Sequence, residues 1–382
     1  MIQSKLPKVD TTIFTVMSKM ANDYNAINLS QGFPDFAVDE KLISLSYEAM
    51  KDGHNQYAPM TGLPVLKAQL ASKVEKLYHL KINQEEEVTI TSGATEALFC
   101  AITAVVEKGD EVIVFEPAYD SYHPVIELCG GKIIPIELSA PNYKIPWDQV
   151  IEKVNNKTKL IIINTPQNPT GTILAKEDLE TLEKIVQKHG LFAMSDEVYE
   201  HLVYDGQEHE SALKYPGLYQ RCFVIYSFGK VFHTTGWKMG YCIAPKALSK
   251  EFRKIHQFVV FSSTTPMQVA MAKYLEDENN YLSLPNFFEA KRNKFCDLIK
   301  SSLFEIIPCK GTYFQLLSYK NITNKKDFEV ASQMTKKLGV AAIPMSAFYG
   351  SQKDEKILRF CFAKQDQTLI KAAEKLCMIK SL

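Results

Sequence analysis

Two lysines stand eight residues apart in a glycine-containing stretch, and lysine is a residue type that forms imines. Lys230 ends the run Ser227-Phe228-Gly229-Lys230, and Lys238 lies in the run Gly236-Trp237-Lys238-Met239-Gly240-Tyr241. One amine could form an imine with a carbonyl compound, while the other amine and the Ser227 hydroxyl neutralise a phosphate. A single lysine after a strand is usually a solvated loop residue, so the pair carries the prediction.

Asp196 follows an apolar run, where an unpaired carboxylate would be costly. A structural salt bridge or a helix N-cap would explain it. Under a pyridine ring, Asp196 would instead keep the ring nitrogen protonated, so that the ring accepts electrons. Tyr199 and Asn168 could each donate a hydrogen bond to a phenolic oxygen on that ring. Taken alone, Tyr199 is better explained by packing.

The stretch Ser92-Gly93-Ala94-Thr95 opens a predicted helix directly after a predicted strand. Backbone N–H groups and the helix dipole make such a junction an anion site, which Gly93, Ala94 and Thr95 would line. Small residues at a strand–helix junction are often only caps, so this motif is weak by itself. Tyr119, after another predicted strand, could stack on an aromatic ring, and core packing explains it equally well.

Arg359 lies in the apolar run Ile357-Leu358-Arg359-Phe360-Cys361-Phe362. A guanidinium buried there needs an anion, because an unpaired buried charge is expensive. The planar fork of arginine suits a carboxylate better than lysine does. From these residues, a structural Asp or Glu and the α-carboxylate of a bound molecule are equally good partners.

The elements that must position these residues are short apolar, β-branched runs that alternate with helical patterns. This alternation predicts an α/β fold with a mainly parallel sheet covered by helices on both faces. Ligands bind at the carboxyl ends of such strands, and four polar loops follow the strands there, so they point to one site. The predicted strands are Val88–Thr91, Glu111–Phe115, Lys132–Ile136, Leu160–Asn164, Leu191–Ser195 and Phe223–Tyr226, and the helices include Ala94–Glu107 and Lys176–Lys188.

The alternation ends near Leu284–Pro285, and the length of 382 residues predicts two domains. We predict a large domain over residues 41–285 and a smaller α+β domain over 286–382. Residues 1–40 look irregular and are predicted to pack beside the small domain. The small domain is predicted to contain a helix at Asn286–Ser301 and strands at Thr312–Leu316, Val340–Pro344 and Ile357–Phe362.

The composition of the chain argues against some classes of binding partner. Lys+Arg and Asp+Glu both total 44, so the formal net charge is zero, which argues against binding to nucleic acid or an anionic membrane surface. The chain contains 8 cysteines and no CxxC pair, a pattern typical of free thiols and not of a metal site. We find no signal peptide and no apolar run of about 20 residues, so the cytoplasm is the expected location.

Together these segments resemble the aspartate-aminotransferase superfamily, fold type I of the pyridoxal-phosphate enzymes, over nearly the whole chain. The residues that carry the resemblance occur in the family's order and approximate spacing: Asn168-Pro169-Thr170-Gly171, Asp196 with Tyr199, Ser227 with Lys230, and Arg359. Each is weak alone, but the ordered set is highly specific. The resemblance implies an aspartate-aminotransferase-like fold and pyridoxal 5'-phosphate as cofactor.

One position departs from the commonest pattern, because many members have arginine where this chain has Lys238. Lysine there is similar to the kynurenine, glutamine and methionine transaminase branch. Within that branch, Thr11-Thr12-Ile13-Phe14 and Gln56-Tyr57-Ala58-Pro59-Met60-Thr61-Gly62 look closest to bacterial methionine aminotransferases. Mammalian-type enzymes have histidine near Ser262, which argues against efficient kynurenine turnover.

The resemblance also implies roles that the residues alone do not. Lys230 would hold the cofactor as a Schiff base, and Gly32 and Asn168 would help Arg359 hold the substrate carboxylate. The chain would act as a homodimer in which Tyr57 reaches the cofactor phosphate of the other subunit. The walls of the side-chain pocket would be Phe14, Tyr119 and the partner's Phe261, a set that suits methionine, aromatic amino acids and other neutral ones.

The predicted function is therefore transfer of an amino group from such amino acids to a 2-oxo acid. Lys230 would act as imine partner and as acid–base catalyst, with ping-pong kinetics. A pyridoxal-phosphate C–S β-lyase would use the same lysine and differ only in what leaves the substrate. A non-catalytic cofactor-binding regulator is a second alternative, although the chain has no spare length for a DNA-binding module.

Overall fold

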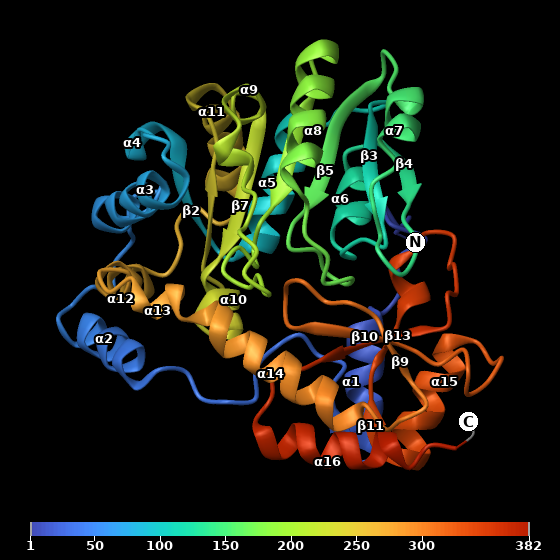
Figure 1. The fold of residues 1–382 in the computed structure, drawn as a ribbon. Helices are drawn as coiled ribbons and strands as arrows, with labels where there is room; N and C mark the ends of the chain where they lie inside the picture. Colours follow the sequence, from blue (N-terminus) through green and yellow to red (C-terminus); the bar gives the residue numbers. More distant parts are fainter. Residues whose placement is uncertain (1, 381–382) are drawn as a thin grey trace.

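A seven-stranded sheet forms the centre of the larger part of the molecule, in a computed structural model that describes residues 2–380 (Figure 1). The strand order is β2-β8-β7-β6-β5-β3-β4. The pairs from β7 to β4 are parallel, whereas β8 runs antiparallel to β2 and β7. The mainly parallel sheet is confirmed, and β8 is a strand that the sequence pattern did not predict. The strands are β2 (Val88–Thr91), β3 (Glu111–Glu116), β4 (Lys132–Glu137), β5 (Thr158–Asn164), β6 (Phe192–Asp196), β7 (Cys222–Ser227) and β8 (Gly240–Ile243).

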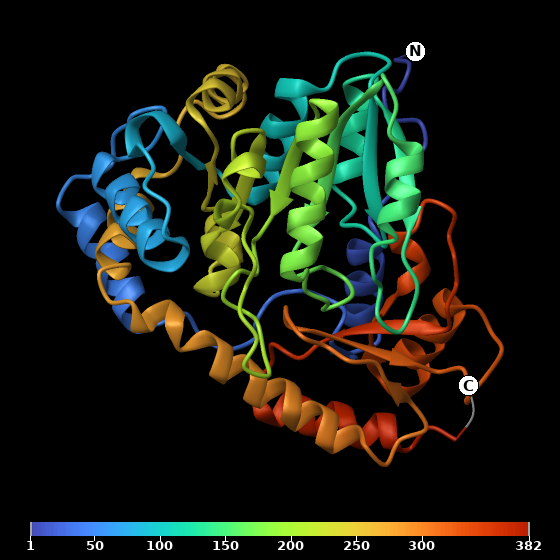
Figure 2. The same cartoon turned by 45° about the horizontal axis from the view of Figure 1, so that its top comes forward.

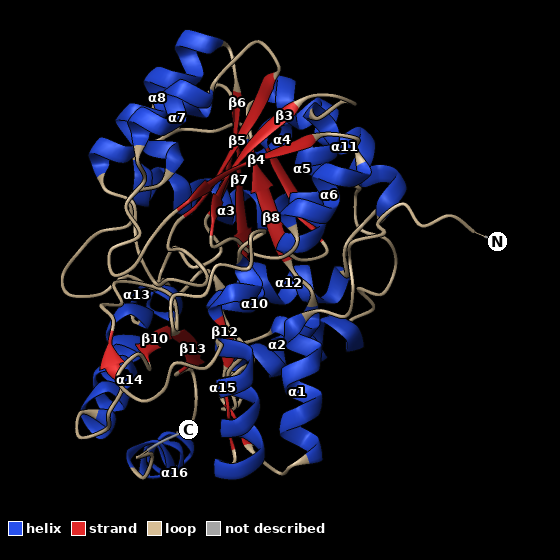
Figure 3. Ribbon diagram, turned by 90° about the vertical axis from the view of Figure 1, so that its right-hand side faces the viewer, coloured by secondary structure: helices blue, strands red, loops and turns tan. Residues whose placement is uncertain are grey.

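Helices cover both faces of this sheet, as Figure 3 shows with the strands in red between two blue layers. Alternate residues of a strand point to opposite faces. Ile161 and Ile163 of β5 therefore pack in the core under α8 (Lys176–His189). Leu160 and Ile162 belong to a second core cluster under α5 (Ala94–Val105) and α11 (Lys246–Val259). Burial on both faces explains the nearly continuous apolar character of these strands.

The N-terminal region is more regular than the sequence predicts. Helix α1 spans Ile13–Asp23, and the Thr12 side chain caps it by accepting a hydrogen bond from the Thr15 N–H at 3.3 Å. Strand β1 (Ile27–Asn28) pairs in parallel with β11 (Val340–Ala341). The expectation of an irregular segment was wrong for α1, whose short amphipathic pattern is weak without the C-terminal residues that it packs against.

A four-stranded antiparallel sheet, in the order β12-β13-β10-β9, lies beside the carboxyl ends of the large sheet (Figure 2). Its strands are β9 (Glu305–Ile306), β10 (Phe314–Ser318), β12 (Ile343–Pro344) and β13 (Ile357–Cys361). The strand predicted at Thr312–Leu316 begins two residues later, because Thr312 has φ +65°, outside the β region. The strand predicted at Val340–Pro344 is two strands, β11 and β12, in different sheets.

Helix α14 (Leu284–Ile299) begins at the predicted domain boundary and runs along the small sheet with α16 (Asp366–Cys377) (Figure 1). The domain boundaries at residues 40 and 285 stay predictions. Within residues 2–380 no helix has the length and apolarity to span a bilayer. The other helices are α2 (Glu40–Lys51), α3 (Pro64–Tyr78), α4 (Gln84–Glu87), α6 (Tyr122–Leu128), α7 (Trp147–Lys153), α9 (Pro216–Tyr219), α10 (Phe228–Val231), α12 (Thr265–Tyr274), α13 (Asn279–Leu282) and α15 (Asp327–Gln333).

Candidate active site

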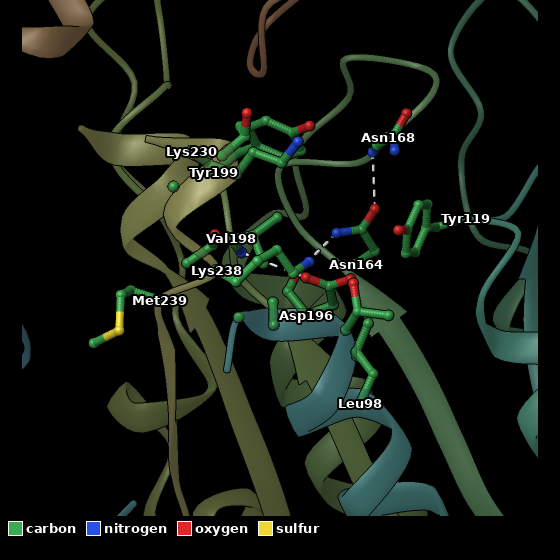
Figure 4. A pocket seen from close by; sticks show the side chains of 16 residues that line it. Leu98, Tyr119, Asn164, Asn168, Asp196, Val198, Tyr199, Lys230, Lys238 and Met239 are labelled. Atoms are coloured by element: carbon green, nitrogen blue, oxygen red, sulfur yellow. Dashed lines mark hydrogen bonds between the residues drawn. The ribbon is translucent and has the colours of Figure 1, made fainter. Parts of the chain in front are cut away.

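A cavity of about 150 Å³ opens where β5, β6 and β7 end and α5 begins (Figure 4). Parallel strands end at the same edge of the sheet, so residues far apart in the sequence meet there. Of the predicted cofactor-binding residues, only Tyr57 lies outside this cavity. The predicted residues that line it are Gly93, Ala94, Thr95, Tyr119, Asn168, Asp196, Tyr199, Ser227, Lys230 and Lys238.

One end of the cavity is positively charged. Helix α5 starts there after Gly93 (φ +80°), and no side chain in the described part of the chain caps its first N–H groups. A Cβ on Gly93 would lie 3.4 Å from the Lys238 Nζ, so this ammonium rests against the helix start. Gly240 permits this closeness, since a Cβ there would lie 2.8 Å from the Ala94 N. With Ser227 beside them, these groups form an anion site suited to a phosphate.

Asp196 lies at the base of the cavity and is 3% exposed. The Tyr122 hydroxyl donates to its Oδ2 at 2.6 Å. Burial raises the pKa of Asp196 to about 6, and the hydrogen bond from Tyr122 partly opposes this increase. A carboxylate so poorly solvated would gain most from a cationic partner, such as a protonated ring nitrogen.

We expect Asp196→Asn to stabilise the cofactor-free protein. The folded-state pKa of about 6 lies above the ordinary value, which means that folding favours the protonated form of Asp196. The contribution of Asp196 to the unfolding free energy is therefore fully present at low pH and is lost as the pH rises through 6. Asparagine keeps an acceptor for Tyr122 without the buried charge. The variant should exceed the wild type in unfolding free energy by roughly 3 kcal/mol at pH 8 and by little near pH 4.

Urea unfolding of both cofactor-free proteins from pH 4 to pH 8 measures this difference. Addition of cofactor should reverse the order at pH 8, because only the wild type then offers a charged partner to the ring. A difference in unfolding free energy that does not change with pH would contradict the prediction.

The amine of Lys230 is directed into the cavity from α10. Its Nζ donates to the Gly32 carbonyl at 3.2 Å and lies 5.8 Å from the ring centres of Tyr199 and Tyr313. Burial lowers the pKa of Lys230 to about 8. An amine with such a pKa is partly unprotonated near neutral pH, which is the form that attacks a carbonyl carbon or accepts a proton.

Arg359 lies in a neighbouring cavity of about 460 Å³, which shares Lys230, Tyr199 and Asn168 with the first. Its guanidinium donates to the Asn168 Oδ1 at 2.6 Å and to the Ser30 carbonyl at 3.0 Å, and it lies 3.8 Å from the centre of the Phe314 ring. Its Nε is buried and has no hydrogen-bond partner among residues 2–380. No carboxylate of residues 2–380 forms an ion pair with Arg359, and its acidic neighbour in the cavity is Asp120. The binding of a substrate carboxylate by Arg359 stays a prediction.

Gly32, predicted to help hold the substrate carboxylate, and Phe14, predicted to form a wall of the side-chain pocket, line the same cavity as Arg359. Gly32 is confined by Phe314, because a Cβ on Gly32 would lie 2.7 Å from the Phe314 Cζ. The Phe14 ring lies 5.2 Å from the Arg359 guanidinium. The N-terminal region thus forms one wall of this cavity.

Comparison with known proteins shows the family of this chain. The model of the family "Aminotransferase class I and II" matches residues 24–376. This chain belongs to that family. The methionine aminotransferase of Escherichia coli is 45% identical over 98% of this chain and 97% of its own length. Kynurenine–oxoglutarate transaminase 3 of Bos taurus is 35% identical over 97% of this chain and 88% of its own length.

Solved structures confirm the aspartate-aminotransferase-like fold. A crystal structure from Escherichia coli, in which a methionine aminotransferase function was identified, has a TM-score of 0.96 with 45% identity and covers 98% of this chain and 99% of that one. A variant of Thermus thermophilus aspartate aminotransferase has a TM-score of 0.91 with 25% identity and covers 99% of both chains. Enzymes of this family use pyridoxal phosphate as cofactor.

The cavity fits that cofactor. The cationic end at Gly93 and Lys238 matches a phosphate in charge, and the buried carboxylate of Asp196 matches a protonated ring nitrogen. The amine of Lys230 enters the same cavity. The cavity of this aminotransferase therefore combines a cationic end, a buried carboxylate and an amine that suit the cofactor.

Tyr57 and Phe261 do not line either cavity of their own chain. Tyr57 is 84% exposed and Phe261 is 44% exposed, and their ring centres lie 5.4 Å apart. Beside them, Asn55–Tyr57 and Ser262–Pro266 border an open hollow. The predicted contribution of both residues to another subunit stays a prediction.

Sequence reasoning missed residues that hold the aminotransferase site together. The Asn164 amide accepts from the Asn168 N–H at 2.8 Å and donates to the Asp196 carbonyl at 2.8 Å, which joins two loops of the site (Figure 4). The Tyr313 hydroxyl donates to the Gly32 carbonyl at 2.6 Å. Asn164 ends a predicted strand, and this position was a usable signal, whereas nothing local marks Tyr313.

A second missed cluster is buried behind the start of α5. Glu96 accepts hydrogen bonds from the Ser92 N–H at 3.1 Å and from the Cys100 thiol at 2.9 Å, and its Oε1 lies 2.9 Å from the His256 Nδ1. The His256 Nε2 lies 2.9 Å from the Met60 carbonyl. Glu96, Cys100 and His256 are close enough to resemble metal ligands. These hydrogen bonds account for their polar atoms, so we interpret them as a brace for the anion site.

Proposed function

We propose that this aminotransferase takes its amino group from methionine and other neutral amino acids, including aromatic ones, and passes it to a 2-oxo acid. The observation that carries the proposal is the guanidinium of Arg359, which has no carboxylate partner in residues 2–380 and is next to aromatic walls. An amino acid bound there by its carboxylate places its side chain against Phe14 and Tyr119. The identity of 45% with a methionine aminotransferase supports methionine as one donor.

The proposed roles follow from the positions of the side chains. The bound cofactor supplies an electron-accepting ring that stabilises negative charge at the substrate Cα. Asp196 holds the proton on the ring nitrogen, while Asn168 and Tyr199 lie on the side of the cavity toward Arg359 and can donate to the ring oxygen. Lys230 binds the cofactor in the resting enzyme and, once free, removes the Cα proton. Because the first product leaves before the second substrate binds, we expect ping-pong kinetics.

We also propose a homodimer with shared sites in a reducing compartment such as the cytoplasm. Exposed aromatic rings such as Tyr57 and Phe261 are typical of an interface between subunits. All eight cysteines are free thiols, which a reducing compartment preserves.

The decisive experiment mixes the cofactor-loaded enzyme with single amino acids in the absence of an acceptor and follows the visible absorption band of the cofactor. L-Methionine and L-phenylalanine should bleach the band, and addition of a neutral 2-oxo acid should restore it. D-Methionine is the matched control, since it cannot bind Arg359 through its carboxylate and present its Cα proton to Lys230 at the same time. A band that persists with every amino acid would contradict the proposal and favour the regulator.

The C–S β-lyase alternative can be distinguished from a transaminase by its products. Pyruvate and ammonia released from a cysteine conjugate without any oxo acid would identify that reaction. A transaminase converts the conjugate only once per active site under these conditions, so repeated turnover without an acceptor would favour the lyase.

A further inference from the structure

The cavity that contains Arg359 also contains a carboxylate without an assigned role. Asp120 lies in the turn between β3 and α6, directly after Tyr119, and it lines the cavity with Thr12, Gln31 and Ser121. The walls of the cavity are therefore not only aromatic. Polar and acidic side chains line it together with the aromatic ones.

Asp120 has no cationic partner among residues 2–380 at ion-pair distance. Burial raises its pKa, and the positive charge of Arg359 acts in the opposite direction. The only lysine and arginine of the described chain that line this cavity are Lys230 and Arg359. Each already has a proposed role, because Lys230 reacts with the cofactor and the Cα proton, and Arg359 binds the α-carboxylate.

We expect this cavity to bind a substrate with a second carboxylate weakly. Its distal carboxylate would leave water for a cavity without a spare cation, and it would approach the carboxylate of Asp120. Like charges brought together in a recognition site are a common device for rejecting a wrong ligand. A neutral side chain of the same size avoids the repulsion, and one with a polar hydrogen, such as an amide, can donate it to Asp120.

The partner subunit would not supply the missing cation. The segments around Tyr57 and Phe261, the two residues proposed to reach the other site, are residues 55–62 and 258–266, and they contain no lysine or arginine. Their side chains are aromatic, aliphatic or neutral polar ones. The charge balance of the cavity is therefore decided by Arg359 and Asp120.

We propose that Asp120 is a specificity-determining residue that excludes dicarboxylic amino acids and dicarboxylic 2-oxo acids from this aminotransferase. The inference rests on the proposed function, because it assumes that the α-carboxylate binds to Arg359. It adds the acceptor class: the 2-oxo acid that closes the cycle is neutral beyond its α-carboxylate, like the oxo acids of methionine and phenylalanine.

The test compares glutamine with glutamate, which differ in one neutral or charged group at nearly equal size. The specificity constant of each half-reaction is measured from cofactor bleaching in the wild type, in Asp120→Asn and in Asp148→Asn, an exposed control on α7. In the wild type we expect glutamine to exceed glutamate by about 10- to 100-fold. Asp120→Asn should raise the constant for glutamate by a similar factor, mainly through KM, and so lower the glutamine-to-glutamate ratio, whereas Asp148→Asn should leave both constants unchanged.

A structural role for Asp120 would lower both constants together, so the glutamine-to-glutamate ratio is the informative quantity. Competitive inhibition by glutarate and butyrate supplies a readout without turnover, and Asp120→Asn should improve inhibition by glutarate alone. Equal use of glutamate and glutamine by the wild type, or a ratio unchanged by Asp120→Asn, would overturn the inference. Methionine tested in the same preparation shows independently whether the proposed function holds, and an enzyme that no amino acid bleaches would refute both.

Discussion

Replacing Lys230 with alanine is expected to lower kcat for methionine by at least about 10³-fold, while the fold survives and the anion site still holds the cofactor noncovalently. The amine of Lys230 is the group proposed both to bind the cofactor and to move the Cα proton, and it is directed into the cavity from α10. No other lysine of the described chain lines both cavities. The rate of bleaching by methionine under single-turnover conditions measures the loss.

Two measurements separate lost chemistry from lost structure. Methylamine, added to the Lys230→Ala enzyme, should restore part of the rate because a small amine can carry the proton in the vacated space. Lys184→Ala, on the exposed face of α8, should retain the wild-type rate. A Lys230→Ala enzyme that keeps more than about one tenth of the wild-type rate would exclude the proposed role.

The second large effect is expected for Arg359→Lys, which should reduce kcat/KM for methionine by about 10²- to 10³-fold. Lysine keeps the positive charge but cannot offer two parallel N–H groups to a carboxylate. It also loses the planar contact of the guanidinium with Phe314, whose ring centre lies 3.8 Å away. Because the charge is retained, the variant avoids leaving an uncharged gap beside Asn168 and Asp120.

An amine that lacks the carboxylate provides the matched control for Arg359. The wild type should strongly prefer methionine to 3-(methylthio)propylamine, and Arg359→Lys should reduce that preference by the same factor by which it lowers kcat/KM for methionine. The rate with the amine itself should change little. If both compounds lose activity equally, Arg359 acts through the structure of the site and not through the substrate carboxylate.

Much of the site could be predicted from the sequence because its residues follow strands. Asp196 and Ser227 end β6 and β7, and Gly93 precedes α5, so a parallel sheet places them at one edge whatever the details of packing. Arg359 was recognisable as a charge in an apolar strand. The sequence could not decide between a structural acid and a bound carboxylate as its partner, since that depends on which side chains approach β13.

Contacts between residues far apart in the chain could not be predicted from sequence patterns. The hydrogen bond from Tyr122 to Asp196 spans 74 residues, and the contact between Glu96 and His256 spans 160. Neither has a periodicity or a motif that a single sequence displays. Helix α1 was missed for a related reason, because its burial depends on β11 and the helical turn before it, more than 300 residues away.

The sequence by itself indicated the family, the mainly parallel character of the large sheet and the lysine, aspartate and arginine of the candidate site, because strand periodicity and residue spacing are local properties. Only the tertiary structure decided the pKa values and charge partners of these groups. It buries Asp196 enough to raise its pKa to about 6, lowers the pKa of Lys230 to about 8 and leaves Arg359 without an ion-paired carboxylate among residues 2–380. It also places Asp120 in the Arg359 cavity. These outcomes depend on how much water each group retains and on which charges surround it, and both are properties of the packed chain.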